Sequence, residues 1–164
     1  TLQPRKNLVR LIDAYAALPA ESRPQLVMAG QRGWLAEPIL ARAQDEGVIV
    51  PGFVAEEDKA ALLSGATAFV FPSLYEGFGF PVLEAMACGT PVICSQTSSL
   101  PEVAGEAALL LDPRDTAAWT HAMARIQREP ASRAELVESG FAQVKRFSWQ
   151  LCAETVMAAI EGAA

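Results

Sequence analysis

The residues best suited to chemistry are two glutamates, Glu76 and Glu84, which enclose a glycine-rich segment at residues 77–81. This segment follows the apolar run 68–71, and it ends in a proline, a residue suited to the first position of a helix. Glycines let the backbone approach a ligand, and a helix N-terminus presents unsatisfied N–H groups at the positive end of its dipole. The pattern therefore predicts an anion site that a diphosphate would fit.

Two carboxylates beside one anion site would repel a phosphate group. We therefore expect Glu76 and Glu84 to accept hydrogen bonds from hydroxyl groups, which a sugar supplies. A simpler interpretation is also open, in which Glu84 stabilises the first turn of its own helix and Glu76 is a solvated loop residue. The residue types alone do not decide between these interpretations.

The distribution of charge restricts how an anion is bound. The formal net charge of -6 and the sequence pI near 4.8 argue against a general nucleic-acid-binding protein, because phosphate backbones require basic surfaces. Residues 60–113 contain neither lysine nor arginine, so a phosphate bound there depends on backbone N–H groups, a helix N-terminus, or cations from elsewhere in the chain. The chain has no Asp-x-Asp motif and no histidine cluster, and we expect no metal site.

Short apolar runs alternate with helical patterns along the chain. We expect strands at residues 25–29, 48–50, 68–71, 91–94 and 108–111. We expect helices at residues 6–18, 35–46, 56–64 and 81–88, followed by three helices that begin near Asp115 and are broken near Pro130 and Ser148. This order predicts an α/β fold, a Rossmann-like parallel sheet with helices on both faces and the C-terminal helices packed on it. Such sheets bind ligands beyond the carboxyl ends of their strands.

No apolar run approaches the ~20 residues that span a bilayer, and no signal peptide opens the chain. The 3 cysteines lack metal-ligand spacing. Cys88 and Cys94 are near enough in sequence to meet, but we interpret them as buried free thiols of a reducing compartment, the cytosol. Residues 1–4 have the character of a loop that leaves a strand, so we expect the chain to be a fragment that starts in or just after the first strand.

The stretch at residues 71–92 reads FPSLYEGFGFPVLEAMACGTPV, and it is similar to the E-x7-E signature of retaining glycosyltransferases with two Rossmann domains, the GT-B architecture. The stretches at residues 4–7, 29–34, 98–105 and 147–149 resemble the same group, glycosyl transferases group 1 or family 4. The resemblance covers essentially the whole chain and implies that residues 1–164 are a single C-terminal, nucleotide-sugar-binding domain. It also implies that an N-terminal acceptor domain is absent from this chain, and it is particularly marked for bacterial mannosyltransferases that use GDP-mannose.

By this resemblance, Glu84 hydrogen-bonds the ribose hydroxyls of the nucleotide, and Glu76 approaches hydroxyls of the transferred sugar. Lys6 matches the lysine that neutralises the departing phosphate, with Arg5 beside it. Without the resemblance, Arg5 and Lys6 would be interpreted as solvated residues in the first turn of a helix. Cations at that place oppose the helix dipole, however, which favours the phosphate role. Thr1 stands where many family members carry a further phosphate-binding arginine.

The remaining predicted contacts belong to the diphosphate and the base. The resemblance places the diphosphate on the backbone around Gly79, Phe80 and Val82. Gly30 closes a predicted strand and borders the donor site. Phe53 follows the next strand, in the stretch that lines the base, and its ring is predicted either to stack on the base or to pack within the protein.

The resemblance implies a hexosyltransferase that transfers a hexose from an NDP-sugar, with GDP-mannose favoured, to a glycan or lipid-linked acceptor with retention of configuration. We expect no cofactor, no metal and no nucleic-acid partner, and we expect this chain alone to be inactive. A cytoplasmic location follows, with peripheral association at the inner face of the membrane left open for the full-length protein. A sugar-nucleotide epimerase, a phosphorylase of the same architecture and a non-catalytic nucleotide-sugar-binding module stay as alternatives. A dinucleotide-dependent oxidoreductase is excluded, because Val82 occupies the third glycine position of G-x-G-x-x-G.

Overall fold

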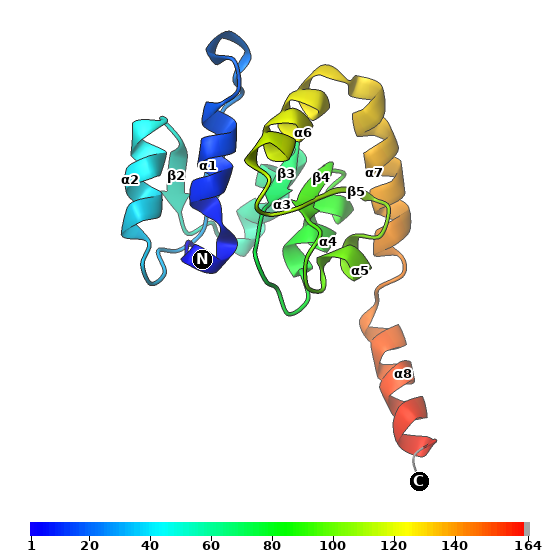
Figure 1. Cartoon of the computed structure of the whole chain (residues 1–164). Helices are drawn as coiled ribbons and strands as arrows, with labels where there is room; N and C mark the ends of the chain where they lie inside the picture. Colours follow the sequence, from blue (N-terminus) through cyan, green and yellow to red (C-terminus); the bar gives the residue numbers. More distant parts are fainter. Residues whose placement is uncertain (163–164) are drawn as a thin grey trace.

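Short parallel strands alternate with helices in the computed structural model, which describes residues 1–162 (Figure 1). The strands are β1 (Val27–Ala29), β2 (Ile49–Gly52), β3 (Phe69–Phe71), β4 (Val92–Ser95) and β5 (Ala108–Leu111). The helices are η1 (Pro4–Lys6), α1 (Leu8–Ala16), η2 (Ala20–Ser22), α2 (Glu37–Asp45), α3 (Glu56–Ser64), α4 (Phe80–Ala87), α5 (Leu100–Ala104), α6 (Thr116–Arg128), α7 (Pro130–Val144) and α8 (Trp149–Glu161). Each predicted strand is present at its expected place, and the predicted α/β class is confirmed.

The strands form two parallel sheets, one with the order β1-β2 and one with the order β3-β4-β5. The predicted parallel strands are thus present, and among the described residues they are divided between two sheets. The N-terminal segment at residues 2–5, which runs into η1, connects the two sheets through backbone hydrogen bonds. Its Leu2 N–H donates to the Gln31 carbonyl beyond β1 at 2.7 Å, and the Leu74 N–H beyond β3 donates to the Arg5 carbonyl at 2.9 Å.

Helices cover both faces of the β3-β4-β5 sheet, as predicted. Successive side chains of a strand point to opposite faces. In β4, Ile93 lies in a cluster with Trp119 of α6 and with α1, whereas Cys94 lies in a cluster with Val82 of α4 and with α5. On its other side, α1 places Ile12 against β1 and α2, so the same helix covers parts of both sheets.

The N-terminal helix differs from the prediction, which placed one helix over residues 6–18. The 3-10 helix η1 carries Pro4 at its first position, and Asn7 then takes a left-handed conformation (φ 56°) before α1 begins. Asparagine tolerates this conformation better than most residues. Its side-chain amide donates to the carbonyls of Pro72 (3.1 Å) and Pro113 (2.7 Å), beyond the ends of β3 and β5. Asn7 therefore fixes η1 at the carboxyl edge of the larger sheet.

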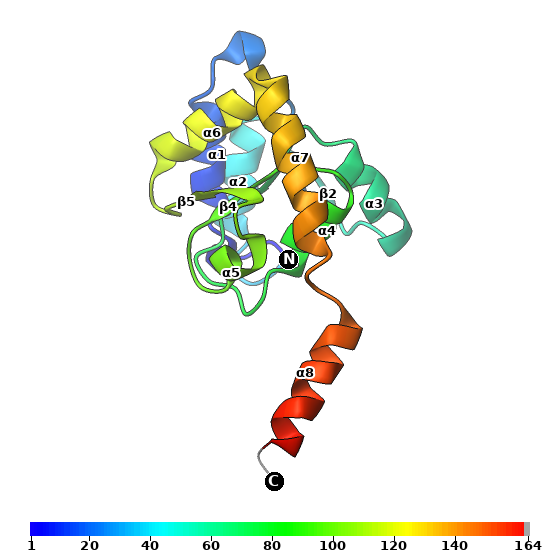
Figure 2. The same cartoon turned by 90° about the vertical axis from the view of Figure 1, so that its right-hand side faces the viewer.

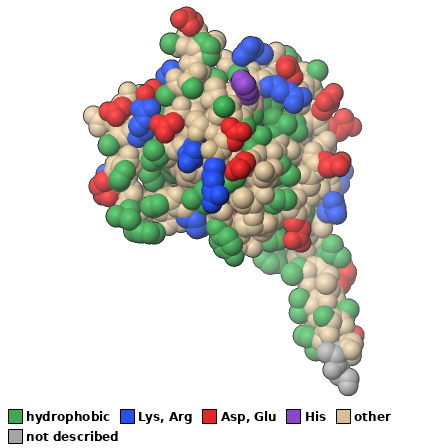
Figure 3. All heavy atoms as spheres, viewed as in Figure 1, with side chains coloured by type: hydrophobic (Ala, Val, Ile, Leu, Met, Phe, Trp, Pro, Cys, Tyr) green, Lys and Arg blue, Asp and Glu red, His purple; other side chains and the backbone are tan. Residues whose placement is uncertain are grey.

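The C-terminal helices pack on the domain only in part. Helix α7 lies against α4, where Gly140 lets the helices approach closely at Met86. Helix α8 projects away from the body in both orthogonal views and has no buried residue, so it departs from the prediction (Figures 1 and 2). The space-filling view shows hydrophobic side chains along it (Figure 3), and the exposed large ones are Trp149, Leu151, Val156, Met157 and Ile160. None of the helices within residues 1–162 is long and apolar enough to cross a membrane.

Candidate functional site

The loops that follow the strands meet η1 at the carboxyl edge of the sheets, which is where parallel sheets bind ligands. The Arg5 carbonyl accepts the hydrogen bond from Leu74 N–H, and the Arg5 guanidinium donates to the Tyr75 carbonyl. These contacts place η1 directly against the loop between β3 and α4. The predicted cations therefore lie beside the predicted anion site.

Glu76 forms ion pairs with both of these cations. Its carboxylate lies 2.7 Å from Lys6 Nζ and 2.8 Å from Arg5 Nη1, although 70 residues separate Lys6 from Glu76 in the sequence. The Glu76 side chain is only 11% exposed and that of Lys6 18%, whereas Arg5 is 38% exposed. Burial raises the pKa of Glu76, but the hydrogen bond from Lys6 and the adjacent Arg5 guanidinium outweigh burial and hold this pKa below its ordinary value. Glu76 is therefore an anion that faces two cations.

Two further side chains, those of Phe71 and Ser73, lie close to the cluster of Arg5, Lys6 and Glu76. The Lys6 ammonium lies over the Phe71 ring, 4.6 Å from its centroid, which is a cation–π distance. The Ser73 side chain, two residues after Phe71, is fully buried, and its hydroxyl has no hydrogen-bond partner among the described residues. The cluster therefore lies against the end of β3 and the first residues after it.

The loop after β4 holds the backbone of the glycine-rich loop. The Glu76 N–H donates to Ser98 Oγ at 2.9 Å, and Ser99 Oγ donates to the carbonyls of Glu76 (3.0 Å) and Phe78. Ser98 has a φ of 53°, a left-handed conformation that serine seldom adopts. The sequence analysis did not assign these serines a role. The signal was the placement of consecutive hydroxyl residues directly after a predicted strand of the same sheet.

The N-terminus of α4 lies at the end of this loop, as predicted. Gly79 has a φ of 119°, and a Cβ atom there would meet the Leu100 side chain at 2.8 Å, so only glycine fits. Phe80 is 52% exposed. The Val82 side chain is fully buried, and its N–H donates to the Gly79 carbonyl at 2.9 Å. The Val82 amide is thus engaged within the loop itself, which leaves a diphosphate to the other N–H groups of this loop and helix end.

Aromatic contacts connect this loop to the start of α8. The ring centroid of Phe78 lies 4.6 Å from that of Phe80 and 5.9 Å from that of Phe147. The Phe80 centroid lies 6.2 Å from that of Trp149. These separations are typical of interacting aromatic pairs. The glycine-rich loop is therefore in contact with the segment that leads into the projecting helix.

Glu84 also has a cation partner, which the sequence analysis missed. Lys59 Nζ of α3 lies 2.9 Å from Glu84 Oε1 and 2.9 Å from Glu56 Oε1. Hydrogen bonds to Glu56 and then to Glu84 raise the pKa of Lys59 above its ordinary value. The sequence does not predict a site role for Lys59, because an ion pair with Glu56, three positions earlier on the same helix, is a sufficient reason for a lysine at this position. Its place immediately before the cation-free stretch was the available signal.

Gly30 and Phe53 border the site at the ends of β1 and β2. Gly30 N–H donates to the Gly52 carbonyl at 2.8 Å, which ties the two strand ends together. Gly30 has a φ of 148°, and a Cβ atom there would lie 3.1 Å from the Thr1 nitrogen. Phe53 is 69% exposed, so its ring is not part of the core and is open to contact with a ligand.

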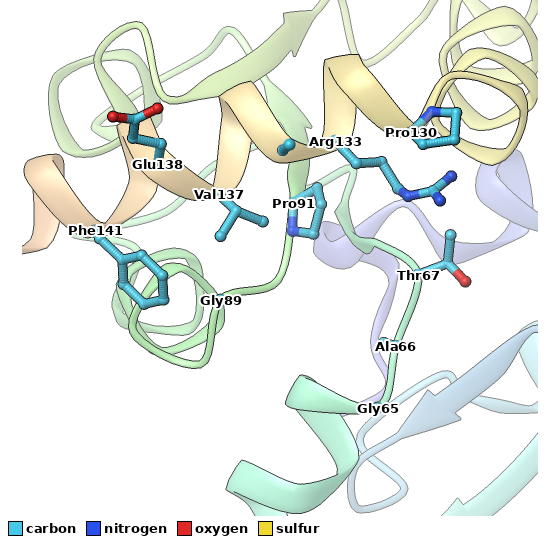
Figure 4. Close-up of a pocket in the computed structure, with 11 residues that line it drawn as sticks. Gly65, Ala66, Thr67, Gly89, Pro91, Pro130, Arg133, Val137, Glu138 and Phe141 are labelled. Atoms are coloured by element: carbon cyan, nitrogen blue, oxygen red, sulfur yellow. The ribbon is translucent and has the colours of Figure 1, made fainter.

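Two other kinds of site, a metal site and a surface hollow, are less well supported by the structure. Among residues 1–162, no group of three or more His, Cys, Asp or Glu side chains is arranged to hold a metal ion. A hollow of about 690 Å³ lies between α7 and the residues that precede β3 and β4, such as Thr67 and Pro91 (Figure 4). Its arginine, Arg133, donates to two carbonyls at the end of α6. This hollow is at the amino ends of the strands and its cation is bound to backbone, so we do not place the site there.

The arrangement at the carboxyl edge can bind a small anion that also carries hydroxyl groups. Arg5, Lys6 and the N-terminus of α4 offer positive charge, while Glu76 and Glu84 offer hydrogen-bond acceptors. Each carboxylate is paired with a cation from another element, so neither stands as an uncompensated negative charge. A phosphorylated sugar derivative meets all of these requirements.

Known sequences resemble this chain over nearly its full length. Residues 1–143 match the family described as Glycosyl transferases group 1. The chain is 43% identical over 158 residues to the O-antigen chain mannosyltransferase B of Escherichia coli. This match covers 93% of this chain and 42% of that protein. It is 35% identical over 167 residues to the MMP alpha-(1->4)-mannosyltransferase of Mycolicibacterium hassiacum. This second match covers 98% of this chain and 41% of that protein. The chain thus spans less than half the length of these relatives.

Solved structures share its fold. Sucrose-phosphate synthase from Thermosynechococcus elongatus superposes with a TM-score of 0.85 at 31% sequence identity, over 99% of this chain and 44% of that chain. The alpha,alpha-trehalose 6-phosphate synthase from Burkholderia multivorans superposes with a TM-score of 0.88 at 17% identity, over 99% of this chain and 41% of that chain. At that identity the second likeness shows the fold alone.

Proposed function

The chain belongs to the glycosyl transferases group 1, with the GT-B type of fold, and we propose that it is the donor-binding domain of a hexosyltransferase. The observation that carries this proposal is the meeting of Arg5, Lys6 and Glu76 beside the N-terminus of α4. Cations for a diphosphate and an acceptor for a sugar hydroxyl lie there side by side. Both relatives reported above are mannosyltransferases, which supports hexosyl transfer by this chain.

The ion pairs of Glu76 suggest how the donor is received. When a nucleotide diphosphate occupies the N-terminus of α4, its oxygens take over Lys6 and Arg5 from Glu76. The released carboxylate then accepts a hydrogen bond from a hydroxyl of the transferred sugar. During transfer, the same cations stabilise the negative charge that develops on the departing diphosphate, at the step where electrostatic stabilisation has its largest effect.

The rest of the donor extends along the carboxyl edge. Glu84 accepts hydrogen bonds from the ribose hydroxyls, and the exposed ring of Phe53 meets the base. GDP-mannose is the favoured donor, because both relatives reported above are named mannosyltransferases. We infer transfer with retention of configuration, without a metal or other cofactor.

The complete protein supplies the remaining parts under this proposal. A glycan or lipid-linked acceptor binds an N-terminal domain, and the active site closes between the two domains. A cytoplasmic location, with peripheral contact at the inner face of the membrane, fits the free state of Cys88 and Cys94.

Calorimetric titration of the complete protein with GDP, UDP and ADP tests the binding step. We expect heat of binding with GDP above the other nucleotides, and no heat with any of the three would refute the proposal. A panel of nucleotide sugars with product analysis then tests the reaction. A transferred sugar supports it, whereas an epimerised nucleotide sugar or a sugar phosphate identifies one of the alternative activities.

Replacement of Lys6 tests its assigned role. Lys6→Ala should lower kcat about 100-fold or more with a smaller effect on KM, because its charge acts mainly on the departing phosphate. Lys145→Ala, at an exposed position just after α7, is the matched control and should leave turnover unchanged. Equal turnover in Lys6→Ala and the control would remove Lys6 from the mechanism.

A further inference from the structure

We propose that Lys59 is a positioning residue for the Glu84 carboxylate, which it orients toward the ribose of the bound nucleotide. The inference rests on the proposed function, because it assigns Glu84 to the ribose hydroxyls. Lys59 belongs to α3 and Glu84 to α4, so their contact joins two helices that flank the site. The residues lie 25 positions apart, and no sequence motif connects them.

The geometry of the contact leaves half of the carboxylate available. Lys59 Nζ reaches Oε1 of Glu84 at 2.9 Å. A carboxylate has two oxygens with separate lone pairs, so a lysine held on Oε1 leaves Oε2 to accept a hydroxyl hydrogen bond. The contact also selects one orientation of a flexible side chain before a ligand arrives, which reduces the conformational entropy that binding must remove.

The competing partner of Lys59 is the more exposed one. The Glu56 side chain is 84% exposed, against 38% for Glu84 and 33% for Lys59. Ion pairs between exposed side chains contribute little because water screens them. The pair with Glu84 is therefore the less exposed of the two, and Glu56 serves as an internal control for a lysine effect that is confined to α3.

The charge balance of the site requires such a cation. Glu84 is the fifth residue of the eight-residue helix α4, one turn beyond the N-terminus that is the proposed diphosphate site and outside the first turn where the sequence placed it. An unpaired carboxylate there would repel the phosphates. Glu76 is compensated by Arg5 and Lys6, and residues 60–113 contain no lysine or arginine that could compensate Glu84. Lys59 is the last basic residue before that stretch, and it provides the compensation.

Calorimetry of the complete protein with GDP and with dideoxy-GDP, which lacks the ribose hydroxyls, tests the inference. Lys59→Met should weaken GDP binding by about tenfold, a shift of about 1.4 kcal/mol, and should change dideoxy-GDP binding by less than about twofold. Lys59→Arg should retain GDP affinity, because an arginine preserves the ion pair. Glu56→Gln should leave both affinities unchanged, since it removes only the exposed partner.

A double-mutant cycle with Glu84→Gln separates positioning from simple attraction. If Lys59 acts through Glu84, Lys59→Met adds no further loss of GDP affinity in the Glu84→Gln protein. An equal loss with both nucleotides, retained in the Glu84→Gln background, would show direct attraction of the phosphates and overturn the inference. If Lys59→Met lowers the melting temperature but leaves GDP affinity unchanged, Lys59 serves only to connect α3 with α4, and the inference is also overturned. Absence of binding of GDP, UDP and ADP to the unmodified protein would instead refute the proposed function.

Discussion

Replacement of Glu76 by glutamine should have opposite effects on GDP and on a nucleotide sugar. In the folded protein, the Glu76 carboxylate occupies Lys6 at 2.7 Å and Arg5 at 2.8 Å, the cations that we assign to the diphosphate. Glu76→Gln removes this competitor and its repulsion of the phosphates. GDP should therefore bind more tightly, whereas turnover of a nucleotide sugar should fall, because the carboxylate that meets the sugar is lost.

The structure sets the size of these effects. The Lys6 pair is largely enclosed, and a hydrogen bond between charged groups in such a place contributes about 1.5 kcal/mol or more. The Arg5 pair is more exposed and contributes about 0.5 kcal/mol. We expect Glu76→Gln to lower the free energy of unfolding by about 2 kcal/mol. Most of this energy becomes available to a diphosphate, so the affinity for GDP should rise by about tenfold.

Urea unfolding and calorimetric GDP titration at neutral pH measure the two quantities in the same preparations. Glu135→Gln, at an exposed position of α7, is the matched control and should change neither of them. Addition of GDP should restore part of the stability lost in Glu76→Gln, since a ligand stabilises the folded state that binds it. Weaker GDP binding by Glu76→Gln than by the unmodified protein would refute the idea that Glu76 holds the place of a phosphate.

Three further properties can be measured directly. Because the folded pKa of Glu76 lies below its ordinary value of 4.5, its contribution to stability is complete above that pH and is lost as the pH falls through the folded pKa. The stability difference between Glu76→Gln and the unmodified protein should therefore shrink in acid urea titrations. Trp119→Ala should lower the free energy of unfolding by about 3–5 kcal/mol in urea, because this side chain is 1% exposed in the core. Burial raises the pKa of the Cys94 thiol to about 12, so mass spectrometry after treatment with a thiol reagent at pH ~8 should find the exposed Cys152 modified and Cys94 intact.

The sequence predicted that Arg5 and Lys6 lie near the glycine-rich loop, and the structure brings these residues together with Glu76. A stretch without lysine or arginine offers a diphosphate only backbone N–H groups and a helix N-terminus, so further positive charge must come from elsewhere in the chain, and Lys6 and Arg5 lie beside this stretch. The start of α4 was also predictable, because Pro81 after glycines favours a helix N-terminus. Strong local signals and a charge requirement therefore located the main elements.

The residues that escaped prediction lack a local signal of that kind. Asn7 and Ser98 adopt left-handed conformations and form hydrogen bonds with residues distant in the sequence, which periodicity does not encode. Helix α5 is five residues long and contains a proline, so it offers less than two turns of pattern. Lys59 can pair with Glu56 on its own helix, so the sequence gives no reason to expect its second ion pair, with Glu84 of α4.

The pairing of each glutamate with a distant cation limits what can be achieved by transplanting the site. A loop copied from residues 71–84 into another scaffold would bring its acids without Arg5, Lys6 or Lys59. Such a graft would repel a diphosphate, however faithfully its backbone were reproduced. An engineer would need to move three separate segments together, and a variant library at Glu76 should be randomised jointly with residues 5 and 6.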